Sequence, residues 1–152
     1  MVTFQILNLQ DLPASASWFL NLYPKGGIFG LRGPLGVGKT TWVKAVVAEL
    51  VNRQKGKMPR VVSPSFVVHQ IYGTNPPVEH FDFYRLELKD PGSLIEIGYW
   101  EAFEKSNHEN GYVFVEWPEK ADLGQLKLTD ELLFSFGPTE GARSIEIKTQ
   151  FR

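Results

Sequence analysis

The hydrophobic and polar residues of the chain recur with periods that predict strands and helices in alternation. Apolar and polar positions alternate over residues 3–7, which indicates a short strand, and helical spacing follows over about 12–23. The apolar run 28–32 is typical of a buried strand. From Lys39 to about Gln54, apolar residues return every three or four positions, so an amphipathic helix is expected there.

The second half of the chain is dominated by predicted strands. Segments rich in β-branched and aromatic residues predict strands over 60–66, 67–72, 78–86, 112–115, 128–136 and 144–148. Residues 73–77 contain Gly, Asn and Pro and are expected to form a hairpin loop. A broken helical region is predicted over 90–105, followed by a polar loop over 106–111. The last two strands carry no motif, and we expect them either to complete a sheet or to line a ligand pocket.

Composition narrows the class of protein. With 152 residues, 43% of them hydrophobic and 22% charged, the sequence predicts one globular domain over residues 1–152. The absence of cysteine excludes a disulfide framework and a cysteine zinc site. The net charge of -1 gives no overall positive field for nucleic acid, although a local patch stays open. Neither a basic, apolar leader nor a run of about 20 apolar residues is present, so a cytoplasmic location without a membrane span is expected.

A glycine-rich segment joins the predicted strand 28–32 to the helix predicted from residue 39. It matches in full the phosphate-binding loop pattern of glycine, four residues, glycine, lysine and threonine, and reads Gly33-Pro34-Leu35-Gly36-Val37-Gly38-Lys39-Thr40. In such a loop, backbone N–H groups and the positive end of the helix converge on phosphate oxygens. Lys39 reaches the β- and γ-phosphates, and the Thr40 hydroxyl takes a position on magnesium. The pattern predicts an α/β, P-loop NTPase-like fold of three layers with a central mixed β-sheet.

Magnesium at such a loop needs a second protein oxygen from the end of a neighbouring strand, and two carboxylates are candidates. Glu116 directly follows the strand predicted at 112–115. Asp82 lies within the strand predicted at 78–86, where alternation places it on the same face as His80 and Tyr84. His80 is interpreted as a hydrogen-bonding neighbour of the site rather than as a base.

Three further blocks accompany the phosphate loop, and they read Ser63-Pro64-Ser65-Phe66, His80-Phe81-Asp82-Phe83-Tyr84-Arg85-Leu86 and Val115-Glu116-Trp117-Pro118. In order and spacing, over nearly the whole chain, they resemble the signature blocks of the TsaE family, also called YjeE. These are small bacterial P-loop ATPases required for threonylcarbamoyladenosine formation in tRNA. Two positions depart from the family, which often has aspartate in place of Pro34 and threonine in place of Ser65. Ser65 keeps a hydroxyl, whereas Pro34 removes a carboxylate and a backbone donor that would affect nucleotide affinity.

The resemblance implies an ATPase that binds ATP and Mg²⁺ and depends on partner proteins. The partners would be TsaB and TsaD, which transfer threonylcarbamoyl to an adenosine in the anticodon loop of tRNA. Residues from Gly33 to Thr41 would hold the phosphates, and Thr40 and Glu116 would hold magnesium. Asp82 would orient or deprotonate the attacking water, with Lys39 as the second catalytic residue.

The resemblance also implies roles for residues around this centre. Ser63, Ser65 and Phe66 look like part of a switch segment that senses the γ-phosphate. A further set is expected to contact the nucleotide site or a partner, and comprises Tyr84, Arg85 and Trp117. The alternative for Trp117 is packing in the core, and the alternative for Arg85 is a surface ion pair with Glu79 or Glu87. Residues 9–11 are interpreted as an adenine contact.

Two other functions stay open from the sequence. A small-molecule kinase needs a lid that supplies cations, and among the six arginines only Arg85 lies beside a candidate catalytic motif. A nucleotide-dependent binding switch with negligible turnover is the second alternative. The sequence lacks the Asn-Lys-x-Asp motif that reads guanine, which favours ATP over GTP. The scarcity of catalytic cations predicts weak hydrolysis by the isolated chain, completed when a partner docks.

Overall fold

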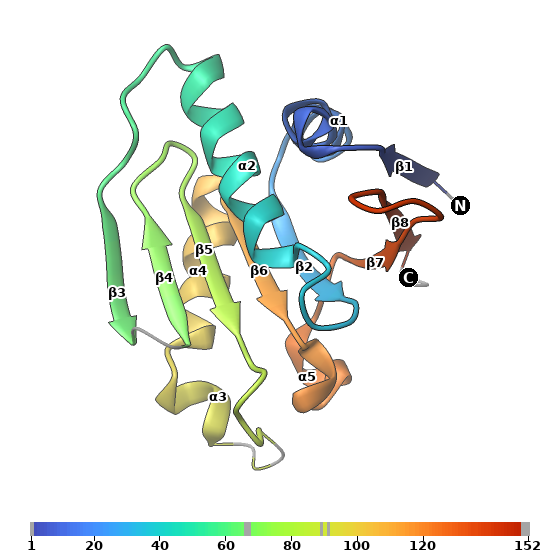
Figure 1. Cartoon of the computed structure of the whole chain (residues 1–152). Helices are drawn as coiled ribbons and strands as arrows, with labels where there is room; N and C mark the ends of the chain where they lie inside the picture. Colours follow the sequence, from blue (N-terminus) through green and yellow to red (C-terminus); the bar gives the residue numbers. More distant parts are fainter. Residues whose placement is uncertain (1, 66–67, 89, 91, 150–152) are drawn as a thin grey trace.

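An eight-stranded mixed sheet organises the computed structural model, which describes residues 2–65, 68–88, 90 and 92–149. From one edge to the other, the strands are β1 (Val2–Ile6), β8 (Arg143–Thr149), β7 (Asp130–Phe136), β2 (Gly27–Arg32), β6 (Tyr112–Glu116), β5 (Val78–Asp82), β4 (His69–Tyr72) and β3 (Val61–Ser65). The four central strands β7, β2, β6 and β5 run parallel. Antiparallel pairs flank them on both sides, so the predicted mixed sheet is confirmed (Figure 1).

Helices cover both faces of the sheet and complete three layers. One face packs against α1 (Leu12–Leu22) and α2 (Lys39–Arg53), where Phe19 and Trp42 meet Phe114 of β6 at the centre of a buried aromatic cluster. The other face packs against α3 (Ser93–Glu96), α4 (Tyr99–Glu109) and α5 (Leu123–Leu126). Two short 3-10 helices, η1 (Leu9–Asp11) and η2 (Pro118–Lys120), precede α1 and follow β6. No helix in the described ranges is long and apolar enough to cross a bilayer.

Most elements lie where the hydrophobic pattern predicts them, and two boundaries differ for local reasons. β5 ends at Asp82 instead of continuing to residue 86, because the Asp82 carboxylate accepts the backbone N–H of Tyr84 at 3.0 Å and closes a turn. The loop predicted at 106–111 is mostly the last turn of α4, which ends where Asn110 adopts a left-handed conformation, with φ of 54°. The strands predicted at 60–66 and 67–72 are found as β3 and β4, while residues 66–67 lie outside the described residues.

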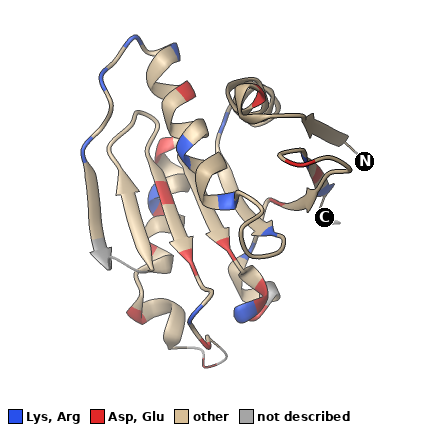
Figure 2. Cartoon of the chain, viewed as in Figure 1, with Lys and Arg blue, Asp and Glu red and all other residues tan. Residues whose placement is uncertain are grey.

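The parallel core brings the carboxyl ends of its strands to one edge of the sheet. Asp82 at the end of β5 is in register with Glu116 at the end of β6, and Glu116 is in register with Leu31 of β2. Figure 2 shows acidic positions at the ends of both β5 and β6. The loop that follows β2 leads into α2 at this same edge, where ligands of open α/β sheets bind.

Candidate functional site

The segment between β2 and α2 forms a tight loop built on glycine conformations. Gly36 and Gly38 have φ of 78° and 107°, in the left-handed region that side chains rarely adopt, and a Cβ at either would meet no atom within 4 Å. Backbone conformation rather than crowding therefore requires glycine at these two positions. Gly38 is the N-cap of α2, so the N–H groups of the first helical turn open onto the loop.

Lys39, the first residue of α2, extends its ammonium back across the loop. Nζ donates to the carbonyl of Gly33 and lies 3.3 Å from that of Pro34, and it stands 4.2 Å from the centroid of the Trp117 ring. Burial lowers the pKa of Lys39, against the opposing effect of nearby carboxylates. The ammonium thus lies over the loop, where carbonyl oxygens and an aromatic face hold it. A phosphate group bound at the loop could take the place of these partners.

Thr40 and Glu116 are brought together, as expected for two magnesium ligands. The Thr40 hydroxyl donates to Oε1 of Glu116, and Nε2 of His80 lies 2.9 Å from the same oxygen. Burial by itself raises the pKa of Glu116, but hydrogen bonding and charge from His80, Thr40 and Lys39 outweigh it and hold the pKa below its ordinary value. Glu116 is therefore an ionised, buried carboxylate beside a hydroxyl, the type of oxygen pair that Mg²⁺ prefers. His80 contacts Glu116 as the sequence interpretation proposed.

The lowered pKa of Glu116 gives a testable effect on stability. Because the folded-state pKa lies below the ordinary value, the ionised carboxylate stabilises the fold above that range, and this contribution is lost as pH falls through the folded-state pKa. Glu116→Gln is expected to lower the melting temperature by about 3–8 °C at pH 7. The difference from the wild type should shrink in the most acidic part of a pH series. Thermal unfolding monitored by circular dichroism measures it.

Glu104→Gln is the matched control, because Glu104 is an exposed carboxylate on α4. It is expected to follow the wild-type pH curve. A gap between Glu116→Gln and the wild type that stays constant from neutral to acidic pH would contradict an ionised, stabilising Glu116.

Asp82 lies beside Glu116 with a different environment. Burial and the negative charge of Glu116 raise the pKa of Asp82, while the N–H of Tyr84 and the charges of His80 and Lys39 oppose the shift. Both carboxylates line a pocket of about 240 Å³ together with residues 35–41, Tyr84 and Trp117, and we call it the phosphate pocket after the loop that borders it. Two adjacent carboxylates whose pKa values move in opposite directions are suited to different tasks, one holding a cation and the other accepting a proton.

The remaining predicted residues divide into those at this pocket and those outside it. Tyr84 and Trp117 line the pocket with ring centroids 5.0 Å apart. Arg85 is exposed next to them and is not among the pocket residues, and Glu79 is buried at 2.8 Å from His69 rather than paired with Arg85.

Of the predicted switch segment, Ser63 lies away from this pocket. Ser63 is exposed on the edge strand β3, two strands beyond β5, and does not line the phosphate pocket. The backbone of Ser65 is in register with His69 of β4. Phe66 lies outside the described residues. Ser63 therefore lies apart from Lys39, Thr40 and Glu116, although its motif predicted that it belongs to the same site.

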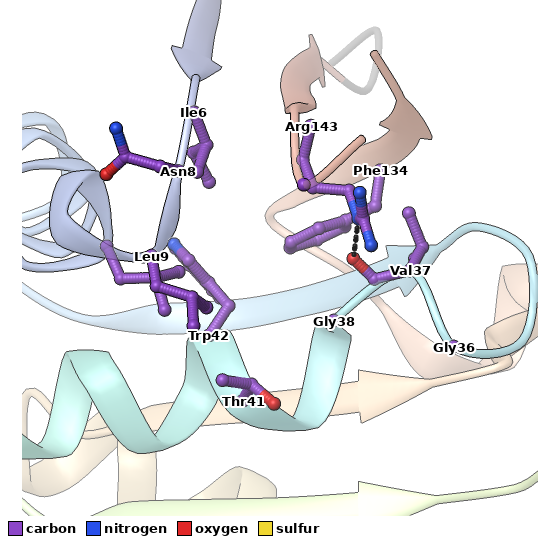
Figure 3. Close-up of a pocket in the computed structure, with 12 residues that line it drawn as sticks. Ile6, Asn8, Leu9, Gly36, Val37, Gly38, Thr41, Trp42, Phe134 and Arg143 are labelled. Atoms are coloured by element: carbon purple, nitrogen blue, oxygen red, sulfur yellow. Dashed lines mark hydrogen bonds between the residues drawn. The ribbon is translucent and has the colours of Figure 1, made fainter. Parts of the chain in front are cut away.

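A second pocket, of about 320 Å³, opens on the other side of the phosphate loop (Figure 3). Its walls come from the N-terminal segment, the loop, α2 and the C-terminal strands: Ile6, Asn8, Leu9, Leu12, Gly36, Val37, Gly38, Thr41, Trp42, Phe134, Gly141 and Arg143. Leu9 of the segment predicted to contact adenine lines it, whereas Gln10 and Asp11 do not. The last two strands complete the sheet, and they also contribute Phe134 and Arg143 to the wall of this pocket.

Phe134 and Arg143 were not identified from the sequence. They lie 96 or more residues beyond Gly38, in strands without a motif. The parallel pairing of β7 with β2 and the antiparallel pairing of β8 with β7 bring them to the loop. An isolated arginine near the end of a chain gives no signal that distinguishes it from a solvated surface residue.

Comparison with known proteins gives a consistent result. The family model described as threonylcarbamoyl adenosine biosynthesis protein TsaE matches residues 6–145. Two proteins named tRNA threonylcarbamoyladenosine biosynthesis protein TsaE are similar to the chain. The one from Nostoc sp. is 36% identical, over 80% of this chain and 70% of that protein. The one from Bacillus subtilis is 30% identical, over 75% of this chain and 65% of that protein. The crystal structure of Bacillus subtilis YdiB superposes with a TM-score of 0.62 at 19% identity, covering 97% of this chain and 84% of that one.

Proposed function

Because the chain belongs to the TsaE family, we propose that it is an ATPase of tRNA threonylcarbamoyladenosine biosynthesis that binds Mg-ATP at the start of α2. The observation that carries the proposal is the convergence of Lys39, the Thr40 hydroxyl and the Glu116 carboxylate on one pocket at a phosphate-binding loop. The names of the relatives support the pathway, and the chemistry of the pocket supports the nucleotide.

The two pockets together fit one elongated ligand. Gly36, Val37, Gly38 and Thr41 line both of them, so the phosphate loop forms a shared wall. The pocket with Lys39 and the two carboxylates is suited to the terminal phosphates. The other pocket presents Leu9, Trp42 and Phe134, apolar surfaces of the kind that enclose a base. We therefore assign adenine to the pocket between η1 and the β7–β8 pair, and we call it the base pocket.

The oxygens of Thr40 and Glu116 are the groups that would hold magnesium. Within the described part of the chain, no three or more His, Asp or Glu side chains gather into a metal site. Two protein oxygens completed by phosphate and water oxygens are the usual arrangement for Mg²⁺ at a nucleotide. When bound there, the metal neutralises negative charge on the terminal phosphates during hydrolysis.

Asp82 and Lys39 are proposed to act on the reacting atoms. The raised pKa of Asp82 increases its proton affinity, which suits a group that orients water and accepts a proton from it. Lys39 would leave the carbonyls of Gly33 and Pro34 for the phosphate oxygens, where its charge stabilises the transition state. Positioning and charge compensation are the main protein contributions to phosphoryl transfer.

The composition of this pocket supports a dependence of hydrolysis on partner proteins. Among the described residues that line it, Lys39 is the single cation and faces two carboxylates. Leu35 and Tyr84 are 67% and 42% exposed at its rim, although both are large and apolar or aromatic. We propose that the TsaB and TsaD proteins dock over this rim and complete the charge around the phosphates, with tRNA contacting the assembly through them.

The test of the proposed function is the rate of ATP hydrolysis with and without TsaB–TsaD and tRNA. The isolated chain is expected to hydrolyse ATP slowly and the complex to raise the rate at least about tenfold, because a partner-supplied cation has effects of that size or larger. Fast turnover by the isolated chain that the complex leaves unchanged would contradict partner dependence. Label from ATP appearing in a nucleoside or sugar acceptor would instead indicate a kinase.

A further inference from the structure

The segment that joins α2 to β3 concentrates positive charge. Residues 50–78 hold four of the 16 basic residues of the chain, Arg53, Lys55, Lys57 and Arg60, and none of its 17 acidic residues. The whole chain has a net charge of -1, so this region and the rest of the molecule carry charges of opposite sign. Figure 2 shows Lys and Arg positions following one another from the end of α2 to the start of β3.

Three of these four cations have no carboxylate partner. Arg53 pairs with Glu49 on the same helix and donates further hydrogen bonds to α1. Lys55, Lys57 and Arg60 are exposed, and none of them forms an ion pair within the part of the chain that the structure describes. We call residues 55–60 the basic segment. Exposed cations that lie so close together, without neutralising carboxylates, create a local positive potential that attracts anions.

Hydrogen bonds hold the backbone of the basic segment at both ends. The N–H of Gly56 donates to the carbonyl of Val51 at 3.1 Å, and the N–H of Gly73 in the β4–β5 loop donates to the carbonyl of Arg60 at 3.3 Å. Six residues span at most about 20 Å even when fully extended. The three cations therefore lie within one short stretch of surface, where a single polyanion can contact all of them.

The residue types favour contact with a phosphate backbone. Tyr72, the aromatic residue among the described part of residues 50–78, is buried, so this region offers no exposed ring on which a base could stack. Lysine and arginine contacts to phosphates position a nucleic acid without reading its sequence. An acidic protein surface fits less well, because lysine is depleted at protein interfaces. The relatives of the chain are named for biosynthesis on tRNA, which favours RNA as the polyanion.

We propose that the basic segment binds the phosphate backbone of RNA directly, through Lys55, Lys57 and Arg60. The choice of RNA rests on the proposed function, whereas the choice of a polyanion rests on the charges. α2 has 15 residues and is about 22 Å long, and the phosphate loop lies at its other end. RNA bound to the basic segment therefore leaves the phosphate pocket and its rim open to ATP and to partner proteins.

The test measures the affinity of the full chain for a fluorescently labelled tRNA transcript by anisotropy at several salt concentrations. Wild-type affinity is expected to fall about 20- to 40-fold between about 50 and 200 mM salt, the dependence expected for contacts to about three phosphates. Simultaneous replacement of Lys55, Lys57 and Arg60 by Gln should weaken binding at least about tenfold at the lower salt concentration. It should also reduce the slope of log affinity against log salt by about one for each residue. ATP affinity should stay within about twofold, because the segment lines neither pocket.

A second triple variant provides the matched control. It replaces Lys44, Lys105 and Lys148 by Gln, three exposed lysines on α2, α4 and β8. The control loses the same total charge from separate positions, so its affinity for tRNA should stay within about threefold of the wild type. An unlabelled tRNA of unrelated sequence should displace the labelled transcript from the wild type as well as the transcript itself does, because the contacts do not read bases.

Three results would overturn the inference. The first is absence of tRNA binding by the wild type or unchanged affinity in the basic-segment variant. The second is an equal loss in both triple variants, which would reflect net charge alone. The third is normal tRNA binding with weakened assembly with TsaB–TsaD, which would make the segment, with the exposed side chain of Met58, a surface for docking a protein. If the tRNA results were as expected but the chain neither bound nor hydrolysed ATP, the inference would stand and the proposed ATPase function would be refuted.

Discussion

Replacing Lys39 with alanine is expected to lower the partner-stimulated rate of ATP hydrolysis about 100- to 1,000-fold, the effect of removing one preorganised charge donor from a transition state. The ammonium lies over the loop, on the carbonyls of Gly33 and Pro34 and the ring of Trp117. Within the part of the chain that the structure describes, it is also the single cation that lines the phosphate pocket, so no other described side chain of that pocket can replace its charge. Hydrolysis is measured as phosphate release in the presence of TsaB–TsaD and tRNA.

Lys44→Ala provides the control for the Lys39 experiment. Lys44 is an exposed lysine on the same helix and outside both pockets, so its loss should leave the rate within about twofold. If Lys39→Ala and Lys44→Ala had equal stimulated rates, Lys39 would not be a catalytic residue. The proposal that the loop binds the phosphates of ATP would then be contradicted as well.

The second large effect is expected at Asp82. Asp82→Asn should reduce the stimulated rate about 100- to 10,000-fold, the range for loss of a general base, with ATP affinity retained. In the wild type, the rate should fall as pH decreases through the raised pKa of Asp82, because the protonated carboxyl cannot accept a proton. This acid limb should be absent from the residual activity of Asp82→Asn. Rates across pH and calorimetric ATP binding measure the two effects separately.

Stability gives an independent readout at the same residue. The folded-state pKa of Asp82 is raised, so its ionised form is disfavoured in the fold, and stability is lost as pH rises through that pKa. Asp82→Asn removes this cost and should melt at or above the wild-type temperature at pH 7. Glu87→Gln, a substitution of an exposed residue five positions along, is the control and should change neither the rate of hydrolysis nor the melting temperature. Loss of ATP binding together with activity in Asp82→Asn would show that Asp82 holds the ligand instead of acting on water.

The parts of the site that the sequence predicts are those encoded locally. The loop and the start of α2 are contiguous, and Glu116 follows directly on a strand whose apolar run marks it as buried. The contact between Glu116 and Thr40 then follows from the parallel pairing of β2 with β6. The end of β5 was predicted too late, since a single hydrogen bond from the backbone N–H of Tyr84 to the Asp82 carboxylate overrides the continuing alternation.

Residues that depend on long-range pairing could not be found in this way. Arg143 contacts Val37, 106 positions away in the sequence, because β8 pairs with β7 and β7 pairs with β2, the strand that precedes the loop. Ser63 illustrates the converse, because it belongs to a motif that resembles a signature block and yet lies on the edge strand β3, away from the phosphate pocket. Motifs thus located the loop and the acidic residues, while the wall of the base pocket depended on tertiary structure.

The central position of β2 also determines when the loop can form during synthesis of the chain. β2 pairs on one side with β6 and on the other with β7, so both neighbours are made about 80 to 100 residues after it. A ribosome-bound chain that has not reached these strands exposes β2 with two unpaired edges, the configuration most prone to self-association. High contact order at the strand that supports the loop predicts slow folding, with the phosphate loop among the last parts of the molecule to assemble.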